Sequence, residues 1–354
     1  MKLLADTIQA IEGQDEVWRG MARERLDRLS MPHWALGRLM DLALDLAGMT
    51  RSLTPPVGRK AVITMAGDHG VTVEGVSKFP SEVTPQMVYN FVHGGAGINA
   101  LAAQAGAEVI VVDMGVAADL SALVDSGRII GAKIASGTGN IAAGPAMRRD
   151  QAVAAVEAGI RVALDQGQGY DLYGTGDMGI GNTTPSAAIG AVLTGRPAEA
   201  MCGRGTGLDD DQLACKVGVV ERALRVNRPD AADPLDVLAK VGGFEIGGIA
   251  GLILGAAVQR KPVLVDGFIS TAGALIACGL VPAARDYIIA AHRSMEPGHA
   301  IMQAHLDIEP LLHLNMRLGE GTGAALAMNV VEAAVAVLTR VATFEEAAVS
   351  GADK

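Results

Sequence analysis

Apolar residues recur at three- and four-residue spacing through the first 50 residues of the chain. This spacing puts them on one face of a helix, so it predicts amphipathic helices. We expect three of them, within residues 3–13, 16–29 and 33–49. Two prolines in the next stretch, SLTPPVGRK, interrupt the pattern and predict that a different region begins there.

Beyond that break, short apolar runs alternate with helical stretches. The runs are AVITMA (61–66), EVIVV (108–112), DLYGTG (171–176), VLV (263–265) and YIIAA (287–291). Runs that are apolar on both faces are typical of parallel strands covered by helices. Helices with recognisable starts are expected at 183–195, 270–280 and 321–341. The alternation predicts an α/β fold with a doubly wound, Rossmann-like parallel sheet.

The division of the chain into domains follows from the same pattern. A chain of 354 residues exceeds the usual size of one domain. We expect residues 1–55 to belong to a smaller helical domain and residues 56–325 to form the α/β domain. The last helix, within residues 326–354, is expected to return and pack with the N-terminal helices.

Composition and charge argue against several classes of protein. Half of the residues are hydrophobic but only 3% are aromatic, so small aliphatic residues and glycine must build a closely packed core. No uncharged apolar run reaches the roughly 20 residues of a spanning helix, and the first residues lack the apolar core of a signal peptide. The net charge of −10 comes without a cluster of Lys and Arg, which nucleic-acid binding requires. We therefore expect a cytoplasmic protein that binds neither membranes nor nucleic acid.

Nearly every polar motif follows one of the predicted strands, and in doubly wound sheets ligands bind beyond the carboxyl ends of the strands. The richest motif is DLYGTGDMGIGNTTPSAA (171–188). Its glycines allow a tight turn with N–H groups facing an anion, and a helix N-terminus follows. A phosphate cradle is therefore predicted at Gly179, Ile180, Gly181, Asn182 and Thr183. The alternative is that the glycines serve only close packing of strand and helix.

The same stretch contains GxGxxG at Gly174, Gly176 and Gly179, so an NAD-dependent oxidoreductase must also be considered. That fingerprint needs an acidic residue at the end of the next strand, roughly 20 residues further on. Glu199 lies near that distance, but GRPAEAMCG does not have the pattern of a strand end. Asp177 inside the loop would also face a pyrophosphate unfavourably. A non-catalytic nucleotide-binding protein is the third possibility.

Glu320 stands between glycines in LGEGTGAA, where a helix is predicted to begin. A carboxylate in a first turn is stabilised by the helix dipole whatever its function, by roughly 0.3–1 kcal/mol. The neighbouring glycines leave it uncrowded, so a planar ligand can approach. We expect the dipole to keep Glu320 ionised and able to accept a proton.

Other polar residues at the predicted strand ends have two interpretations. Asp68, Asp113 and Asp266 can contact ribose hydroxyls or accept hydrogen bonds from loop N–H groups. The motif HRSMEPGH (292–299) has two histidines and a glutamate, but it lacks the helical spacing of HExxH, so we expect no metal there. Contacts to a ligand carboxylate or to neighbouring side chains fit it better. The cysteines match no disulfide framework or zinc motif, and buried reduced thiols are expected at Cys202, Cys215 and Cys278.

Seven motifs occur in a characteristic order between about residues 60 and 330. They are GDHGV, HGGAGINALA, GDMGIGNTTPSAA, GGFEIGGIAG, VDGFISTAGAL, HRSMEPGH and RLGEGTGAALA. This ordered set resembles the nicotinate-nucleotide–dimethylbenzimidazole phosphoribosyltransferases of cobalamin nucleotide-loop assembly. The resemblance implies a homodimer with a Rossmann-like sheet and a small helical domain made from both chain ends.

The resemblance also implies roles for individual residues. Glu320 corresponds to the general base, and Asp177 stands where the family carries Glu as a second functional carboxylate. The loop of residues 179–184 corresponds to the phosphate loop, and Lys216 in LACKVGVV to a lysine that pairs with the phosphate. The remaining correspondences are Asp266 and Ser294 at the nicotinate and ribose, and Gln86 and Leu318 in the pocket for the base.

The implied reaction transfers 5-phosphoribosyl from nicotinate mononucleotide to 5,6-dimethylbenzimidazole or a related base. Nicotinate leaves C1′ as a pyridine, so neither a metal nor another cofactor is required. One nitrogen of the base attacks C1′ from the opposite face, which inverts the configuration from β to α. Its other nitrogen becomes acidic, and Glu320 takes the proton.

Overall fold

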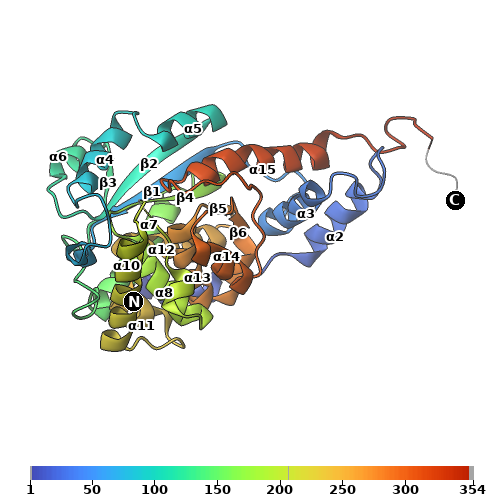
Figure 1. The fold of residues 1–354 in the computed structure, drawn as a ribbon. Coiled ribbons are helices and arrows are strands. Elements are labelled where there is room, and N and C mark those ends of the chain that lie inside the picture. The colour runs from blue at the N-terminus through green and yellow to red at the C-terminus, as the bar shows by residue number, and fades with distance from the viewer. Residues whose placement is uncertain (1, 206, 351–354) are drawn as a thin grey trace.

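Six parallel strands form the centre of the protein in the computed structural model, which describes residues 2–205 and 207–350. Their order in the sheet is β3-β2-β1-β4-β5-β6 (Figure 1). The strands are β1 (Lys60–Gly67), β2 (Ala107–Gly115), β3 (Ile130–Gly131), β4 (Leu172–Met178), β5 (Val263–Val265) and β6 (Ile288–Ala290). The order reverses between β1 and β4, as in a doubly wound sheet. The predicted fold class is confirmed.

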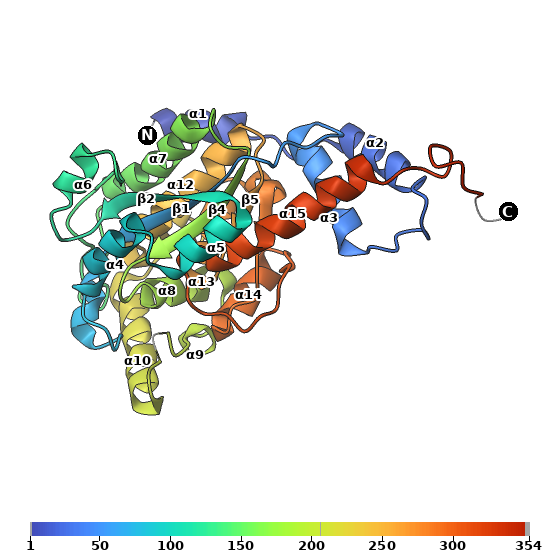
Figure 2. The ribbon, with the colours of Figure 1, turned by 90° about the horizontal axis from the view of Figure 1, so that it is seen from above.

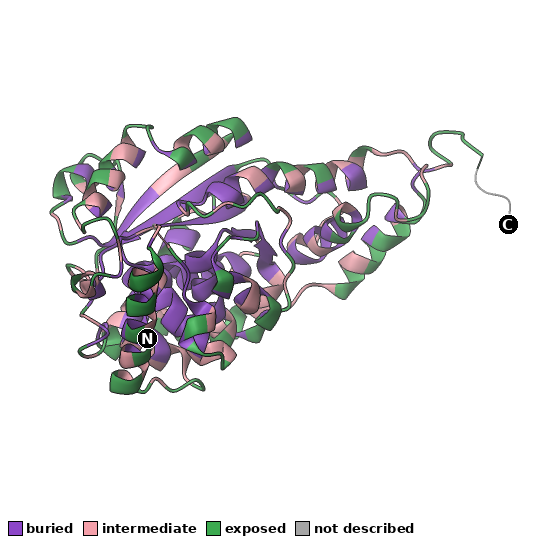
Figure 3. Ribbon diagram, viewed as in Figure 1, coloured by how far each residue is buried: buried purple, intermediate pink, exposed green. Residues whose placement is uncertain are grey.

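The apolar runs in the sequence became strands because helices cover both faces of the sheet. Every residue of β1, β5 and β6 is buried. Each of the five runs identified from the sequence contains or overlaps a strand, but β3 was missed because it has only two residues at the sheet edge. Figure 3 shows the buried strands between helices whose outer sides are exposed.

Helices α4, α5 and α15 lie on one face of the sheet, and α7, α12 and α13 lie on the other (Figures 1 and 2). Their bounds are Val83–Val92 (α4), Gly97–Ala105 (α5), Arg149–Gln166 (α7), Phe244–Val258 (α12), Phe268–Leu280 (α13) and Thr322–Arg340 (α15). The further helices are α8 (Thr183–Thr194), α9 (Ala198–Met201), α10 (Asp210–Asn227), α11 (Pro234–Val241) and α14 (Pro297–His305). Helices α8, α11 and α14 pack on α7 or α13, and α9 and α10 pack on these further helices in turn. The short elements are α6 (Ser121–Asp125) and the 3-10 helices η1 (Gly70–Glu74) and η2 (Pro282–Tyr287).

Glycine explains how α7 and α12 pack so closely. A Cβ added to Gly159 in α7 would lie 1.9 Å from the carbonyl oxygen of Gly248 in α12. A Cβ added to Gly251 would lie 1.9 Å from the carbonyl oxygen of Val156. The two helices therefore meet backbone to backbone, which confirms the close packing expected from a core poor in aromatic residues.

The small domain consists of α2 (Glu16–Leu26), α3 (Arg38–Thr50) and the C-terminal part of α15, and it projects from the body (Figures 1 and 2). Helix α15 reaches from the sheet to α3, so one continuous helix joins the two parts. Helix α1 (Lys2–Ala10) lies elsewhere than we expected: it packs on α7 and α12, where the N–H of Leu4 donates to Glu157. The expected membership of residues 1–55 in the small domain therefore does not describe α1.

The start of α3, the burial of the cysteines and the apolar helix α15 differ from what the sequence led us to expect. Helix α3 begins at Arg38 instead of near residue 33, because Trp34 and Gly37 adopt positive φ values of 55° and 50°. Cys215 on α10 is exposed, so the expectation of a buried thiol is wrong there, whereas Cys202 is buried and Cys278 is half-buried. Among the described residues, α15 alone is long and apolar enough to span a membrane by composition, but 56% of its most apolar window is buried inside the protein.

Candidate active site

A cavity of about 790 Å³ opens beyond the carboxyl ends of the strands. Its size is that of a pocket for a small molecule. The loop after β4 and the segment before α15, with Leu318 and Glu320, both line the cavity. The side walls come from α4 and α5, from the first turn of α13, and from the loop between β6 and α14.

The loop after β4, where the anion cradle is predicted, makes a tight turn before α8. Gly181 has a φ of +89°, which an L residue rarely adopts, and a Cβ on Gly179 would lie 2.3 Å from the carbonyl oxygen of Gly67. The N–H of Ile180 donates to the hydroxyl of Thr84 over 3.1 Å, which ties the loop to α4. Asn182 is the N-cap of α8, so the loop delivers a helix N-terminus to the cavity.

Lys216 lies behind this loop and does not line the cavity. Its Nζ donates to Thr183 Oγ1 over 2.8 Å and to the carbonyl oxygen of Gly203 over 3.1 Å. Burial lowers the pKa of Lys216, and Glu296 opposes that effect. The lysine therefore supports the end of the cradle, and its pairing with a phosphate remains a prediction.

Glu320 is held in an unusual backbone conformation at the cavity wall. Its φ is +64°, between Gly319 and Gly321, and α15 begins only at Thr322. Its carbonyl oxygen accepts the hydroxyl of Thr64 over 3.0 Å. A Cβ on Gly176 would lie 2.3 Å from that oxygen, so the glycine in β4 makes room for the segment. The backbone of Glu320 is thereby fixed by contacts to two central strands.

The electrostatics of Glu320 differ from our expectation. Its Oε2 accepts the N–H of Ile98 over 3.0 Å, so it caps α5 and not the helix that follows it. Burial raises the pKa of Glu320, the bond from Ile98 opposes the rise, and Asp266 adds to it. The carboxylate therefore lies at the N-terminus of α5 and not in the first turn of the helix that follows it, and burial has the largest effect on its pKa. A raised pKa brings the carboxylate closer to the range of an effective general base.

Asp177 ends β4 and faces the same cavity. Its Oδ2 accepts Asn182 Nδ2 over 3.0 Å, whereas its buried Oδ1 has no hydrogen-bond partner. Burial raises the pKa of Asp177 well above its usual value, with further contributions from Asp266, Glu245 and Glu320. A carboxyl group that retains its proton and has a free oxygen can hydrogen-bond to a substrate.

An apolar surface lies beside Glu320. It is made by Val83 and Met87 of α4, Leu101 of α5, and Leu318, which is 60% exposed at the mouth. The predicted Gln86 is exposed and does not line the cavity, because Val83 and Met87, four residues apart, take the inward side of α4. Gln86 does not line this cavity in the structure, and its contact with the base stays a prediction.

The third wall combines Ser294 with the N-terminus of α13. Ser294 lines the cavity and is buried, as is His292 beside it. Asp266 is fully buried behind this wall, where its oxygens accept the N–H groups of Gly321 at 3.2 Å and Ala324 at 3.0 Å. Asp266 therefore caps α15 and does not itself reach the cavity.

Known proteins of one family are similar to this protein over nearly the whole chain. A phosphoribosyltransferase family model matches residues 11–349. The nicotinate-nucleotide–dimethylbenzimidazole phosphoribosyltransferase of Syntrophotalea carbinolica is 63% identical over 350 residues, which cover 99% of each chain. The enzyme of the same name from Desulfotalea psychrophila is 59% identical over 355 residues, with all of each chain covered. The chain belongs to the nicotinate-nucleotide–dimethylbenzimidazole phosphoribosyltransferase family.

A solved structure of a family member supports this placement. The crystal structure of the nicotinate-nucleotide–dimethylbenzimidazole phosphoribosyltransferase from Thermus thermophilus matches with a TM-score of 0.90. Its sequence is 44% identical, and the match covers 96% of this chain and all of that one. The backbone around the cavity is therefore that of the family.

The oxidoreductase alternative is not favoured in this family member. Gly174 and Gly176 lie inside β4 and not in a turn after it. A Cβ on Gly174 would lie 3.0 Å from the Cβ of Ala324, so these glycines admit α15 and the segment before it. Glu199 lies in the short, peripheral helix α9. The GxGxxG pattern is thus a packing feature.

Most site residues predicted from the sequence come together at one cavity. The lining residues include Asp177, residues 179–183, Ser294, Leu318 and Glu320. The carboxylates of Asp68 and Asp113 accept loop N–H groups, from Ala117 and Val116 respectively, as the simpler of their two interpretations proposed.

Sequence reasoning missed two features of the site. The first is a buried contact of 2.8 Å between His69 Nε2 and Glu245 Oε1, which joins GDHGV to GGFEIGGIAG beneath the phosphate loop. The second is Arg317, an exposed cation on the cavity wall. The motifs GDHGV and GGFEIGGIAG were visible in the sequence, but no local spacing connects residues 69 and 245.

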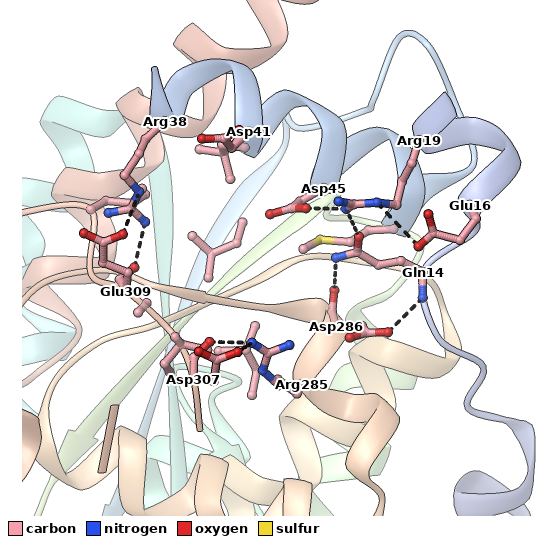
Figure 4. Close-up of a pocket in the computed structure, with 17 residues that line it drawn as sticks. Gln14, Glu16, Arg19, Arg38, Asp41, Asp45, Arg285, Asp286, Asp307 and Glu309 are labelled. Atoms are coloured by element: carbon pink, nitrogen blue, oxygen red, sulfur yellow. Dashed lines mark hydrogen bonds and ion pairs between the residues drawn. The ribbon is translucent and has the colours of Figure 1, made fainter. Parts of the chain in front are cut away.

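A second cavity, of about 400 Å³, lies between the small domain and β6 (Figure 4). Its lining is dominated by charged pairs: Arg19 contacts Asp45 and Glu16, Arg38 contacts Glu309, and Arg285 contacts Asp307. Gln14 Nε2 also donates to the carbonyl oxygen of Asp286 over 2.7 Å. None of the residues placed at the active site by sequence lines this cavity, and we assign it to the junction of the two domains.

Proposed function

We propose that this protein transfers the 5-phosphoribosyl group of nicotinate mononucleotide to 5,6-dimethylbenzimidazole or a related base. The products are α-ribazole 5′-phosphate and nicotinate, and the reaction serves the assembly of the lower ligand of cobalamin. The observation that carries the proposal is the position of Glu320. Its carboxylate, with a raised pKa, lies between an apolar surface and an anion cradle in one cavity.

The donor carries two anionic groups, and the cavity has a helix N-terminus for each. The phosphate is placed in the cradle at the N-terminus of α8, supported by Lys216 through Thr183. The pyridine carboxylate is placed near Ser294 and the first turn of α13. Anchoring both ends orients C1′ between them, which lowers the entropic part of the barrier.

Arg317 gives the cavity a means to attract this donor. The lining carries the acidic side chains Asp177, Glu296 and Glu320, and Arg317 is the only Lys or Arg among the described residues that line it. The chain as a whole has a net charge of −10. A cation at the mouth counters that field for an anionic substrate.

The acceptor base is placed against Val83, Met87, Leu101 and Leu318. One ring nitrogen attacks C1′ as the bond from C1′ to the nicotinate nitrogen breaks, and nicotinate leaves as a pyridine. The other ring nitrogen loses its proton to Glu320. Asp177, whose pKa is raised by burial, is available to bond to the ribose through its free Oδ1. All electrons and protons are accounted for without a metal.

The test is incubation of the purified protein with nicotinate mononucleotide and a panel of bases, with products identified by mass spectrometry. We expect α-ribazole 5′-phosphate or its analogue together with equimolar nicotinate. Dimethylbenzimidazole, benzimidazole, adenine and phenols differ by few contacts, so the panel also identifies the preferred acceptor. Absence of any transfer, with reduction of NAD by an added substrate, would overturn the proposal.

We further propose a cytoplasmic homodimer whose partners are these small molecules, and not membranes or nucleic acid. Large apolar side chains are exposed at and beside the cavity mouth: Phe79 (52%), Met295 (56%), Leu314 (55%) and Leu318 (60%). Such a group of exposed apolar side chains is typical of an interface. Light scattering after gel filtration should give twice the chain mass, and a monomer at micromolar concentration would contradict it.

A further inference from the structure

The buried histidine at the end of HRSMEPGH has no part in the chemistry above. His299 is the third residue of α14 and is fully buried. Both of its ring nitrogens are hydrogen-bonded within the protein, Nδ1 to the backbone N–H of Ser294 at 2.9 Å and Nε2 to Thr271 Oγ1 at 2.9 Å. It therefore has no free lone pair for a metal or a ligand.

The donors and acceptors along this path can be assigned. A backbone N–H can only donate, so Nδ1 of His299 accepts from Ser294 and carries no proton. Burial lowers the pKa of His299 to about 3, so the ring is neutral and its proton lies on Nε2. Nε2–H then donates to Thr271 Oγ1, and the Thr271 hydroxyl donates to the carbonyl oxygen of Gly267 over 2.8 Å.

This path connects two parts of the cavity wall that are distant in sequence. At one end is Ser294, which lines the cavity from the loop after β6. At the other end is Gly267, the N-cap of α13, which also lines the cavity. The imidazole ring and the threonine hydroxyl therefore set the separation between Ser294 and the first N–H groups of α13.

We propose that His299 and Thr271 are positioning residues that shape a carboxylate subsite between Ser294 and the N-terminus of α13. The inference rests on the proposed function, because it assigns that subsite to the pyridine carboxylate of the donor. It makes these two residues, which never touch substrate, determinants of the choice between a pyridine carboxylate and its amide.

The groups left free at this subsite are donors. Ser294 Oγ accepts the N–H of Glu296 at 3.3 Å, so its own hydroxyl proton is free to donate. The first N–H groups of a helix lack intrahelical acceptors, and the helix dipole favours an anion there. A carboxylate satisfies these donors with two acceptor oxygens, whereas the NH₂ group of an amide offers further donors. A small change in separation would weaken this discrimination.

The first test compares Thr271→Val with Thr271→Ser. Valine removes the partner of His299 Nε2–H, whereas serine retains a hydroxyl. We expect Thr271→Val to raise the KM for nicotinate mononucleotide and the Kd for nicotinate about tenfold, the factor that corresponds to about 1.4 kcal/mol. The KM for the base and the Kd for inorganic phosphate should not change, and Thr271→Ser should restore donor binding.

A matched control is Thr194→Val, in the last residue of α8. Thr194 Oγ1 donates to the carbonyl oxygen of Gly190, the same bond within a helix that Thr271 makes to Gly267, but without an imidazole partner. Equal nicotinate affinity in Thr271→Val and Thr194→Val, measured by calorimetry, would overturn the proposal. If the wild type binds nicotinate but forms no ribazole phosphate, the proposed function fails while the subsite stands.

A second measurement is made on the wild-type protein, and a variant serves only to assign the signal. Long-range ¹H–¹⁵N NMR of histidine-labelled wild type reports the tautomer of each ring, and His299 is assigned by its loss in His299→Gln. We expect His299 to be neutral, with its proton on Nε2, throughout the range in which an ordinary histidine titrates. A proton on Nδ1, or titration near pH 6.5, would refute the assigned path.

Discussion

The cavity beyond the strand ends and the cavity beside the small domain both carry many charges, but their polar atoms are satisfied differently. At the strand ends, Asp177 Oδ1, His292 Nδ1 and Glu296 Oε2 are buried without a partner. Within residues 2–205 and 207–350, no such atom belongs to a residue lining the domain-junction cavity. There, Arg38 donates to the carbonyl oxygens of Pro310 at 2.7 Å and Glu309 at 2.8 Å.

The difference separates a site built for a ligand from one built for cohesion. A buried polar atom without a partner costs folding free energy, so its presence points to a partner that arrives later. Carboxyl groups with raised pKa values collect in the same cavity for the same reason. At the domain junction, burial also raises the pKa of Asp45, but Arg19 bonds to it and opposes the rise. Substitutions in the strand-end cavity should therefore lower activity more than stability, whereas substitutions at the domain junction should lower stability and leave activity unchanged.

The largest effect is expected at Glu320. Glu320→Gln retains an oxygen that can accept the N–H of Ile98, but its amide cannot take a proton from the base. We therefore expect kcat to fall by about 10²–10⁴-fold, the usual contribution of a general base. In the wild type, kcat should rise with pH through the raised pKa of Glu320, because only the ionised form accepts a proton. This rise of kcat with pH should be absent in the variant. Nicotinate production followed by chromatography measures both, and unchanged turnover would remove Glu320 from the mechanism.

Asp177 should show activity and stability moving in opposite directions. Asp177→Ala should lower kcat/KM by about 10–100-fold, as expected for a lost substrate contact, whereas Asp177→Glu should be tolerated. The folded-state pKa is raised, so wild-type stability falls as pH rises from the unfolded value towards the folded one. Asp177→Asn should therefore melt higher than the wild type above that window and the same below it. Equal melting temperatures of the wild type and Asp177→Asn at every pH would contradict a raised pKa of Asp177.

A smaller effect is expected at Arg317. Arg317→Gln should raise the KM for nicotinate mononucleotide about threefold at low salt, and the difference should shrink as salt screens the charge. The KM for the uncharged base should not change. Arg196→Gln is the control, because Arg196 is exposed beyond the far end of α8, about 18 Å along a 12-residue helix from the phosphate loop. An equal response in both variants would mean that only net charge matters.

The smallest effect on activity is expected at the domain junction. Arg38→Met removes hydrogen bonds to two backbone carbonyls at a partly exposed position, so the free energy of unfolding should fall by about 1 kcal/mol. The values of kcat and both KM values should stay within experimental error. Urea unfolding followed by circular dichroism gives the first quantity. A loss of activity larger than that of stability would show that this cavity also serves catalysis.

Much of this contrast was inaccessible from the sequence. The strand runs and the helix starts at Thr183 and Thr322 followed from local periodicity, and they placed Asp177 and Glu320 at the correct edge of the sheet. The bond from Ile98 to Glu320, however, links residues 222 positions apart. The sequence around Gln86 does not show which side of α4 faces inward, where Met87 lines the cavity. The two-residue strand β3 is too short to leave a periodic signal.

The sequence by itself determined the alternation of strands and helices, the edge of the sheet at which the polar motifs lie, and the glycine-rich turn before α8, because each depends on residues within a few positions of one another. Only the tertiary structure decided that Glu320 caps α5 and has a raised pKa, that Asp266 and Lys216 act from behind the walls, and that Gly174 and Gly176 make room for the segment before α15 and the start of that helix. These properties depend on burial and on partners from distant segments, and they exist only once the sheet and its helices are assembled.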